Sequence, residues 1–397
     1  MATLNGCALL APKPDSTLPK KTPSEAVTTK PVAPAARYEL GQIVQPAAFE
    51  DIPGWTSDDL RATWPGFLAS CKAMTAKPSG APWKRVCDMA KTVDGSSAEA
   101  VRAFYEGRLS PFALVNPETN SNEGLITGYY EPLLRGSRKQ EGPFQTPVLA
   151  VPNDLLTIEL GDVVPELKNM RLRGRLDGNK VIPYGSRNDI VGQTGYRPGK
   201  DKVLLWVDDA VELFFLQIQG SGRVKLPDGS MVRLGYADQN GHPYRSVGRV
   251  LIDRGELKPE EASMQGIQNW ARKNPSKLND LLNANPSYVF FRELPATPNP
   301  DLGPPGAQGV PLTPERSIAI DPKFTPLGVP VFLATTRPNS GEALNRLMLA
   351  QDTGGAIRGI VRADFFWGFG PTAGELAGKM KQTGRMWLLL PPEAAPR

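Results

Sequence analysis

The chain has 397 residues, of which 40% are hydrophobic and 22% charged, as in a globular protein long enough for two domains. Its 40 Pro and 39 Gly residues predict many turns and short strands, which favours an α+β or all-β fold over a helical bundle. The net charge is +5, but Lys and Arg form no runs, so nothing supports nucleic-acid binding. Because His242 is the only histidine, His-rich zinc or iron sites are excluded, and we expect no metal and no cofactor.

The N-terminal segment predicts an anchor and a tether. Leu4-Asn5-Gly6-Cys7 is similar to the end of a bacterial lipoprotein signal, in which the cysteine is lipidated. Residues 8–37 contain six prolines and no aromatic residue, so we expect a disordered tether that lets the folded body reach away from a membrane. No stretch of the sequence is long and apolar enough to span a bilayer.

Helical patterns follow from about residue 56 to residue 108. Leu60, Trp64, Leu68 and Cys71 recur at helical spacing, and Pro65 must kink or restart that helix. Ser96 and Glu99 predict a capping box for the next helix. Two neighbouring helical patterns carry Cys71 and Cys87, which could form a disulfide in an oxidising compartment or stay separate as buried thiols.

From Gly124 onwards short apolar runs alternate with turn signals, which predicts strands and a change of domain. We expect strands at 125–130, 147–151, 203–207, 212–218 and 231–236, helices at 259–273 and 276–284, and further strands at 288–291, 317–320, 329–333, 347–350 and 385–390. The simplest division is a body made from both chain ends with a β-domain inserted between them: the tether 1–37, a helical part 38–130, the insert 131–255 and a C-terminal part 256–391. The cleft between two such domains would hold a ligand.

Asp352 and Asp364 are the most informative residues. Asp352 lies in a Gly-rich turn, Gln351 to Gly355, and Asp364 leads the aromatic run Phe365-Phe366-Trp367. A buried carboxyl group tends to stay protonated, and a protonated acid beside flat aromatic rings is suited to cleaving a glycosidic bond. Asp352-Thr353-Gly354 also matches the aspartic-protease signature, but those enzymes need two facing copies and this chain has one. The simplest alternative is a turn in which Asp352 caps its own backbone.

Other segments combine hydroxyls, amides and aromatic rings. They are Thr127–Pro132 with Tyr129, Gln217–Gly222 with Gln219 and Ser221, and Asp364–Gly370. Rings can stack on sugars while amides pair with their hydroxyl and acetamido groups, although for any single aromatic residue core packing is the favoured explanation. His242, in the turn sequence 240–244, makes either a structural hydrogen bond or a substrate contact.

In this order, the segments resemble the membrane-bound lytic murein transglycosylase A family. The resemblance runs from about Gly124 to Pro391 and includes Thr127–Pro132, Gln219–Gly222, Asp352–Gly359 and Gly368–Ala373. It implies an α+β fold, mainly β with helices, in which a double-psi β-barrel body built from both chain ends carries an inserted second β-barrel domain. The C-terminal part is similar to the three-aspartate domain of the family, with Asp321, Asp352 and Asp364 as the matching acids.

The family resemblance also implies an activity. Such enzymes cleave the bond between N-acetylmuramic acid and N-acetylglucosamine in peptidoglycan without water and leave a 1,6-anhydro sugar. By resemblance Asp364 is the acid and then the base, Asp352 tunes it, and the sugar is held by Thr127, Tyr129, Gln219, Ser221, Ala356 and Asp321. We therefore expect a monomer that binds glycan strands, anchored through Cys7 at the outer membrane on the periplasmic side. Alternatives are a non-catalytic wall-binding protein and a hydrolase.

Overall fold

The computed structural model describes residues 38–397, except 168–169, 171, 193–198, 298 and 397. Cys7 and the predicted tether 8–37 lie outside the described residues. Within the described part, no helix combines the length and the apolar character that crossing a bilayer requires.

A helical layer precedes the first long strands. Helix α1 (Leu40–Ile43) and short strand β1 (Val44–Pro46) are followed by the 3-10 helices η1 (Phe49–Asp51), η2 (Trp55–Ser57) and η3 (Leu60–Thr63), then by α2 (Trp64–Thr75), η4 (Pro78–Trp83), α3 (Lys84–Ala90) and α4 (Ala98–Arg108). Pro65 occupies the first turn of α2, where its missing N–H costs nothing, so this proline restarts the helix as predicted. Trp64 and Phe104 pack edge to face with ring centroids 5.0 Å apart, which joins α2 to α4.

The predicted capping box of Ser96 and Glu99 is wrong, because α4 begins one residue later than expected. Ser97 is the N-cap of α4 and accepts a hydrogen bond from the N–H of Ala100. Ser96 instead donates its hydroxyl to Asp94 in the preceding turn. Two consecutive serines offer the same chemistry, and only the backbone conformation decides which one caps the helix.

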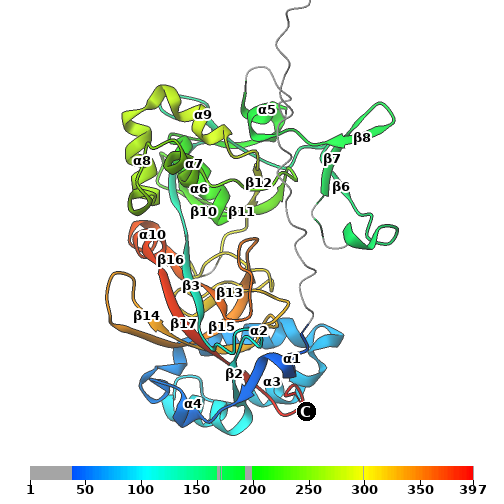
Figure 1. The fold of residues 1–397 in the computed structure, drawn as a ribbon, viewed down its shortest axis with the longest axis vertical. Helices are drawn as coiled ribbons and strands as arrows, with labels where there is room; N and C mark the ends of the chain where they lie inside the picture. The colour runs from blue at the N-terminus through cyan, green and yellow to red at the C-terminus, as the bar shows by residue number, and fades with distance from the viewer. Residues whose placement is uncertain (1–37, 168–169, 171, 193–198, 298, 397) are drawn as a thin grey trace, which may run out of the picture. The chain divides into compact units, whose positions relative to one another are not determined.

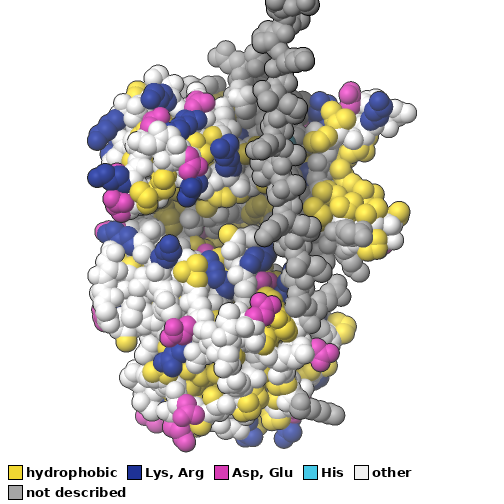
Figure 2. All heavy atoms as spheres, viewed as in Figure 1, with side chains coloured by type: hydrophobic (Ala, Val, Ile, Leu, Met, Phe, Trp, Pro, Cys, Tyr) yellow, Lys and Arg dark blue, Asp and Glu magenta, His cyan; other side chains and the backbone are white. Residues whose placement is uncertain are grey.

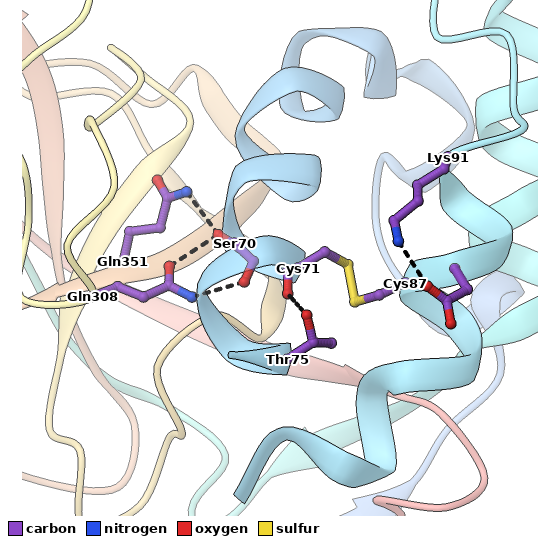
Figure 3. The surroundings of a disulfide bond; sticks show 8 residues. Ser70, Cys71, Thr75, Cys87, Lys91, Gln308 and Gln351 are labelled. Atoms are coloured by element: carbon purple, nitrogen blue, oxygen red, sulfur yellow. Dashed lines mark hydrogen bonds and ion pairs between the residues drawn. A yellow bond between two sulfur atoms is a disulfide. The ribbon is translucent and has the colours of Figure 1, made fainter. Parts of the chain in front are cut away.

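A disulfide joins Cys71 in α2 to Cys87 in α3, which decides between the two alternatives left open by the sequence (Figure 3). Both cysteines are buried in the same hydrophobic core as the barrel strands. The disulfide holds α2 and α3 together, so these two short helices do not rely on packing alone.

Six strands close into the barrel of the body. Their order is β17 (Lys381–Leu390), β14 (Pro330–Thr336), β15 (Ala343–Thr353), β13 (Ser317–Ile320), β16 (Arg362–Phe369) and β3 (Gly124–Glu131), and β3 pairs back onto β17. The pairs β13–β15 and β16–β3 are parallel, and the others in the ring are antiparallel. Strand β2 (Ser110–Leu114) pairs with β17 on one side and with β1 on the other. Helix α10 (Gly370–Lys379) follows β16 (Figure 1). The predicted α+β class with a double-psi barrel built from both chain ends is confirmed.

The insert begins where β3 leaves the barrel at Glu131. Its main sheet has the order β12 (Val289–Leu294), β11 (Met231–Gln239), β10 (Ser221–Lys225), β4 (Leu133–Ser137), β9 (Val203–Val207) and β5 (Thr146–Leu149), and a bridge between Ala150 and Phe291 joins its two edges. A smaller sheet contains β6 (Leu156–Ile158), β7 (Leu172–Asp177) and β8 (Lys180–Pro183). The remaining helices are η5 (Pro165–Leu167), α5 (Arg187–Val191), η6 (Lys200–Lys202), α6 (Ala210–Gln219), α7 (Val247–Asp253), η7 (Pro259–Glu261), α8 (Met264–Lys273), η8 (Pro275–Lys277) and α9 (Leu278–Asn283).

The insert extends past residue 255, where the sequence placed its end. Trp270 of α8 and Leu281 of α9 pack in one cluster with Phe214 of α6, and β12 belongs to the main sheet of the insert. Helix α7 ends at Asp253, and Gly255, with φ of +69°, turns the chain there without ending the domain.

The strand predicted at 212–218 is wrong, because these residues lie in helix α6. Asp209 caps the helix by accepting hydrogen bonds from the N–H groups of Val211 and Glu212. Gly220 ends it in the left-handed conformation with φ of +80°. Because most of its side chains are apolar, the segment lacks helical periodicity in sequence and reads like a buried strand.

We expect the disulfide to stabilise the body. Replacing both cysteines, Cys71→Ala with Cys87→Ala, should lower the free energy of unfolding by about 3 kcal/mol, because the link restrains a 16-residue separation in the unfolded chain. Urea unfolding followed by tryptophan fluorescence would measure this loss. Cys7→Ala is the matched control and should leave the midpoint unchanged. An unchanged midpoint in the double variant would contradict the prediction.

Candidate functional site

One row of paired residues crosses four barrel strands and carries both predicted acids. Ala319 in β13 is the register partner of Asp352 in β15 and of Asp364 in β16. On the other side of β16, Asp364 pairs with Thr127 in β3. Directly paired residues point to the same face of a sheet, and the small side chain of Ala319 leaves space between the acids. The barrel therefore brings Asp352, Asp364 and Thr127 together.

Asp352 is held by donors on both carboxylate oxygens. Its Oδ1 accepts hydrogen bonds from the backbone N–H groups of Ala307 and Thr353, each at 2.9 Å. Its Oδ2 accepts one from the hydroxyl of Tyr129 at 3.1 Å. Asp352 is the second-to-last residue of β15, so the glycine turn begins after it and does not contain it. Its carboxylate is fixed in place and has little capacity left for a reacting proton.

Asp364 has a different environment. Its Oδ1 accepts a hydrogen bond of 2.5 Å from the hydroxyl of Thr127, which in turn accepts one of 2.9 Å from Arg362 Nη2. Within the described residues the Oδ2 atom of Asp364 has no hydrogen-bond partner. This atom is not fully buried. One oxygen is therefore held by Thr127, while the other accepts no hydrogen bond from the described residues.

Burial raises the pKa of both acids. For Asp364 the loss of solvent is the largest cause, and the charge of Asp352 raises the pKa further, whereas the Thr127 hydrogen bond and Arg362 lower it. For Asp352 burial again raises the pKa, against the backbone donors and Tyr129. Asp352 thus has three donors that favour its charged form, whereas Asp364 has one hydrogen-bond donor and the nearby charge of Arg362.

A groove with a cavity volume of about 420 Å³ lies beside this row. One wall belongs to the body: Tyr129, Pro304–Ala307 and Asp352–Gly355. The other belongs to the insert: Gln217–Ser221, Gly235, Tyr236, Val289, Arg292 and Leu294. Thr127 and Asp364 adjoin the groove through their pairing with the row but are not among its lining residues. On the face shown in Figure 2 basic and acidic side chains are interspersed, so no basic patch marks a nucleic-acid surface there.

The end of α6 supplies the polar part of the insert wall. Gln219 is the last residue of the helix, and Ser221 opens β10 directly after the left-handed Gly220. The Oε1 atom of Gln219 accepts a hydrogen bond of 3.3 Å from the N–H of Tyr130 in β3. Both predicted residues therefore lie in the groove, placed by a helix end and not by the strand that the sequence suggested.

Asp321 and Ala356 lie outside the residues that line the groove. Asp321 is buried, and its carboxylate accepts hydrogen bonds from the N–H groups of Lys323 at 3.2 Å and Gly359 at 3.0 Å. It thereby fixes the loop that follows Asp352. Ala356 is an exposed residue of that loop, next to the lining residue Gly355. His242 lies within the insert, where its Nε2 contacts the carbonyl of Tyr184 at 2.7 Å, a structural hydrogen bond.

A buried ion pair that the sequence does not predict lies at the junction of body and insert. Glu131, at the end of β3, accepts a hydrogen bond of 2.8 Å from Arg223 of β10. Arg223 also donates to the carbonyls of Pro300 and Leu302 on the returning segment, and its guanidinium lies 3.7 Å from the ring centre of Phe369. One arginine thus ties both crossing segments to the barrel, and residues this far apart give no local sequence signal.

A buried amide network behind Asp352 was also missed (Figure 3). Gln351 donates to the hydroxyl of Ser70 at 2.9 Å and accepts from Ser317 at 2.6 Å. Ser70 donates to Gln308, whose own backbone N–H donates to the carbonyl of Gln351. The disulfide-linked helix α2 therefore holds both the strand end that carries Asp352 and the loop that donates to it.

Comparisons with known proteins agree with this architecture. The profile of the MltA-specific insert domain matches residues 125–292, and that of the 3D domain matches residues 316–390. Membrane-bound lytic murein transglycosylase A of Escherichia coli K12 is 34% identical over 271 residues, 66% of this chain and 65% of that protein. Its counterpart in Vibrio cholerae is 31% identical over 272 residues, with 65% of that protein covered. The match thus spans slightly less than two thirds of these curated relatives.

Solved structures match over a larger share. MltA from Neisseria gonorrhoeae is 38% identical with a TM-score of 0.78, covering 89% of this chain and 94% of that one. LtgG, a lytic transglycosylase of Burkholderia pseudomallei, is 44% identical with a TM-score of 0.61, covering 90% and 96%. E. coli MltA with bound chitohexaose is 27% identical with a TM-score of 0.62, covering 84% and 90%. On these matches and the shared two-part architecture, the chain belongs to the membrane-bound lytic murein transglycosylase A family.

Proposed function

We propose that this protein is a lytic transglycosylase that cleaves the β-1,4 bond between N-acetylmuramic acid and N-acetylglucosamine in peptidoglycan. The observation that carries the proposal is Asp364: one oxygen is held by Thr127, the other is open, and the pKa is raised beside a groove with a polar wall. Family membership and a relative crystallised with chitohexaose support a glycan as the ligand of that groove.

In the proposed reaction Asp364 acts first as acid and then as base. Its proton passes to the glycosidic oxygen as the bond from that oxygen to the anomeric carbon of the muramic acid breaks. The resulting carboxylate takes the proton from the 6-hydroxyl of the same sugar while O6 bonds to the anomeric carbon. The products are a 1,6-anhydro sugar and a free N-acetylglucosamine 4-hydroxyl, and no water is consumed.

Asp352 has a supporting role in this mechanism. A hydrolysing glycosidase needs a second carboxylate as base or nucleophile. Both oxygens of Asp352 are engaged by Ala307, Thr353 and Tyr129, which leaves it poorly suited to either task. Its charge instead raises the pKa of Asp364 and keeps the proton there until the leaving oxygen is in place.

Sugar binding is assigned to the groove walls. We infer that Gln219 and Ser221 pair with hydroxyl or acetamido groups, and that Tyr129 lies under the sugar beside the acids. Thr127 orients Asp364, and backbone groups around Ala356 border the same space. Asp321, predicted as a sugar contact, is better assigned to positioning because its carboxylate is used by backbone N–H groups.

Two other functions lead to different observations. A non-catalytic wall-binding protein of the same fold would bind sacculi without releasing soluble products. An aspartic protease would need a second Asp-Thr-Gly turn facing Asp352, and the acid that shares its row is Asp364, followed by aromatic residues. The row of Thr127, Asp364 and Asp352 favours glycan cleavage over both.

For the cellular setting we propose a monomeric periplasmic enzyme held at the outer membrane by a lipid on Cys7. The lipoprotein-like segment before Cys7 and the Pro-rich stretch after it support an anchor with a tether. Relatives named membrane-bound are consistent with this location.

Asp364→Asn should reduce the release of anhydro-muropeptides from purified sacculi by at least about a thousandfold, because an amide can neither give nor take the proton. Mass spectrometry separates the anhydro product from a hydrolysis product that is one water heavier. Asp253→Asn on the exposed face of α7 is the matched control and should retain activity. Near-normal turnover by the Asp364 variant would show that another group moves the proton.

Two variants should shift the pH profile in opposite directions. Activity is lost as pH rises through the pKa of Asp364, since the acid must start protonated. Asp352→Asn removes a charge that raises this pKa, so the alkaline limb should move to lower pH. Thr127→Val removes a hydrogen bond that lowers it, so the limb should move to higher pH. Measuring kcat from pH 4 to pH 9 tests both signs, and shifts in the same direction would contradict the assignment.

The anchor makes a separate prediction. The full-length protein, expressed from its own gene in a Gram-negative host, should incorporate radiolabelled palmitate and sediment with outer membranes. Cys7→Ala should abolish labelling and release the protein to the periplasmic fraction, because a single acylated cysteine carries all the lipid. Labelling that persists in Cys7→Ala would place the lipid elsewhere.

A further inference from the structure

Arg292 carries the positive charge of the groove lining, and Asp352 the negative charge. Arg292 lies in β12 on the insert wall, and Asp352 lies on the wall formed by the body. The other lining residues are neutral. The proton transfer by Asp364 does not require a guanidinium on the opposite wall of the groove. The presence of Arg292 there therefore indicates that this side chain binds a ligand.

Arg292 is not used within the protein. In the described part of the chain it forms neither an ion pair nor a side-chain hydrogen bond, and it is exposed. The adjacent acid, Glu293, points to the other face of the strand and is bound by Arg138, with 2.9 Å between Arg138 Nη2 and Glu293 Oε2. Asp352 has donors on both oxygens already, so Arg292 is not required as its counter-ion.

The other arginines near the acids are engaged. Arg362 donates to Thr127 and to backbone carbonyls, and Arg358 donates to the carbonyls of Gly354 and Ile357. Opposite Arg292 in β11 stands Gly235, which offers no side chain for the arginine to pack against. The guanidinium is therefore available at the groove with its planar set of donors.

We propose that Arg292 binds a carboxylate of the glycan substrate and thereby distinguishes murein from uncharged chitin-type chains. N-acetylglucosamine offers only hydroxyl and acetamido groups, whereas muramic acid brings a lactyl carboxyl group that is either free or joined to a peptide with its own carboxylates. A guanidinium pairs with a carboxylate through two parallel hydrogen bonds. This inference rests on the proposed function, since it names the substrate feature read by the same groove.

Binding measurements in an Asp364→Asn background separate recognition from turnover. The three probes are chitohexaose, glycan strands freed of peptides by an amidase, and strands that keep their peptides. Arg292→Gln should weaken binding of at least one carboxylate-bearing probe by about tenfold and leave chitohexaose unchanged. Arg292→Lys keeps the charge without the fork and should give an intermediate loss. Arg272→Gln, at an exposed site on α8 outside the groove, is the matched control.

The pattern of losses decides the source of the carboxylate. Weaker binding of peptide-free strands assigns the lactyl group, and a loss confined to peptide-bearing strands assigns the peptide. An equal loss on chitohexaose, or no loss on either anionic probe, would overturn the proposal. If the wild-type protein released no anhydro product while Arg292→Gln still lost only the anionic probes, the carboxylate site would stand and the transglycosylase assignment would fall.

Discussion

The parallel pairing of β3 with β16 is the contact on which the site depends. It joins segments 237 residues apart and places Thr127 beside Asp364 and Tyr129 beside Phe366. The same strand, β3, closes the barrel against β17 and then leads into the insert at Glu131. The position of β3 therefore has three consequences: it places Thr127 against Asp364, it closes the barrel, and it starts the second wall of the groove.

Asp352 and Asp364 lie in one row of paired residues, but their neighbours give them different surroundings. Both are half-buried and both have raised pKa values. Asp352 stands at a strand end where loop N–H groups converge on it, whereas Asp364 stands within a strand whose own N–H groups serve the sheet. The number of available donors, and not the residue type, distinguishes the surroundings of the two carboxyl groups.

Local chemistry made much of the fold predictable. The restart of α2 at Pro65, the strands around 203–207 and 317–320 and the region of the two acids follow from turn residues and apolar periodicity. Helix α6 was not predictable in this way, because a segment buried on most sides loses the alternation that distinguishes helix from strand. The cap at Ser97 depends on which of two consecutive serines has the extended backbone conformation. The extension of the insert past residue 255 depends on packing contacts that no short window contains.

The amino-acid sequence alone identifies the available groups: Asp352 and Asp364 in a polar, aromatic context, a single histidine, one Asp-Thr-Gly, and motifs in an order that resembles one family. Their partners and their burial became visible only in the folded chain. Folding links Cys71 to Cys87 and turns the carboxylate of Asp321 toward backbone N–H groups. It also places donors on both oxygens of Asp352, while only one oxygen of Asp364 accepts a hydrogen bond from the described residues. Hydrogen bonding and burial act across strands and helices that are distant in the chain, so the protonation preference of a carboxyl group is fixed only after folding.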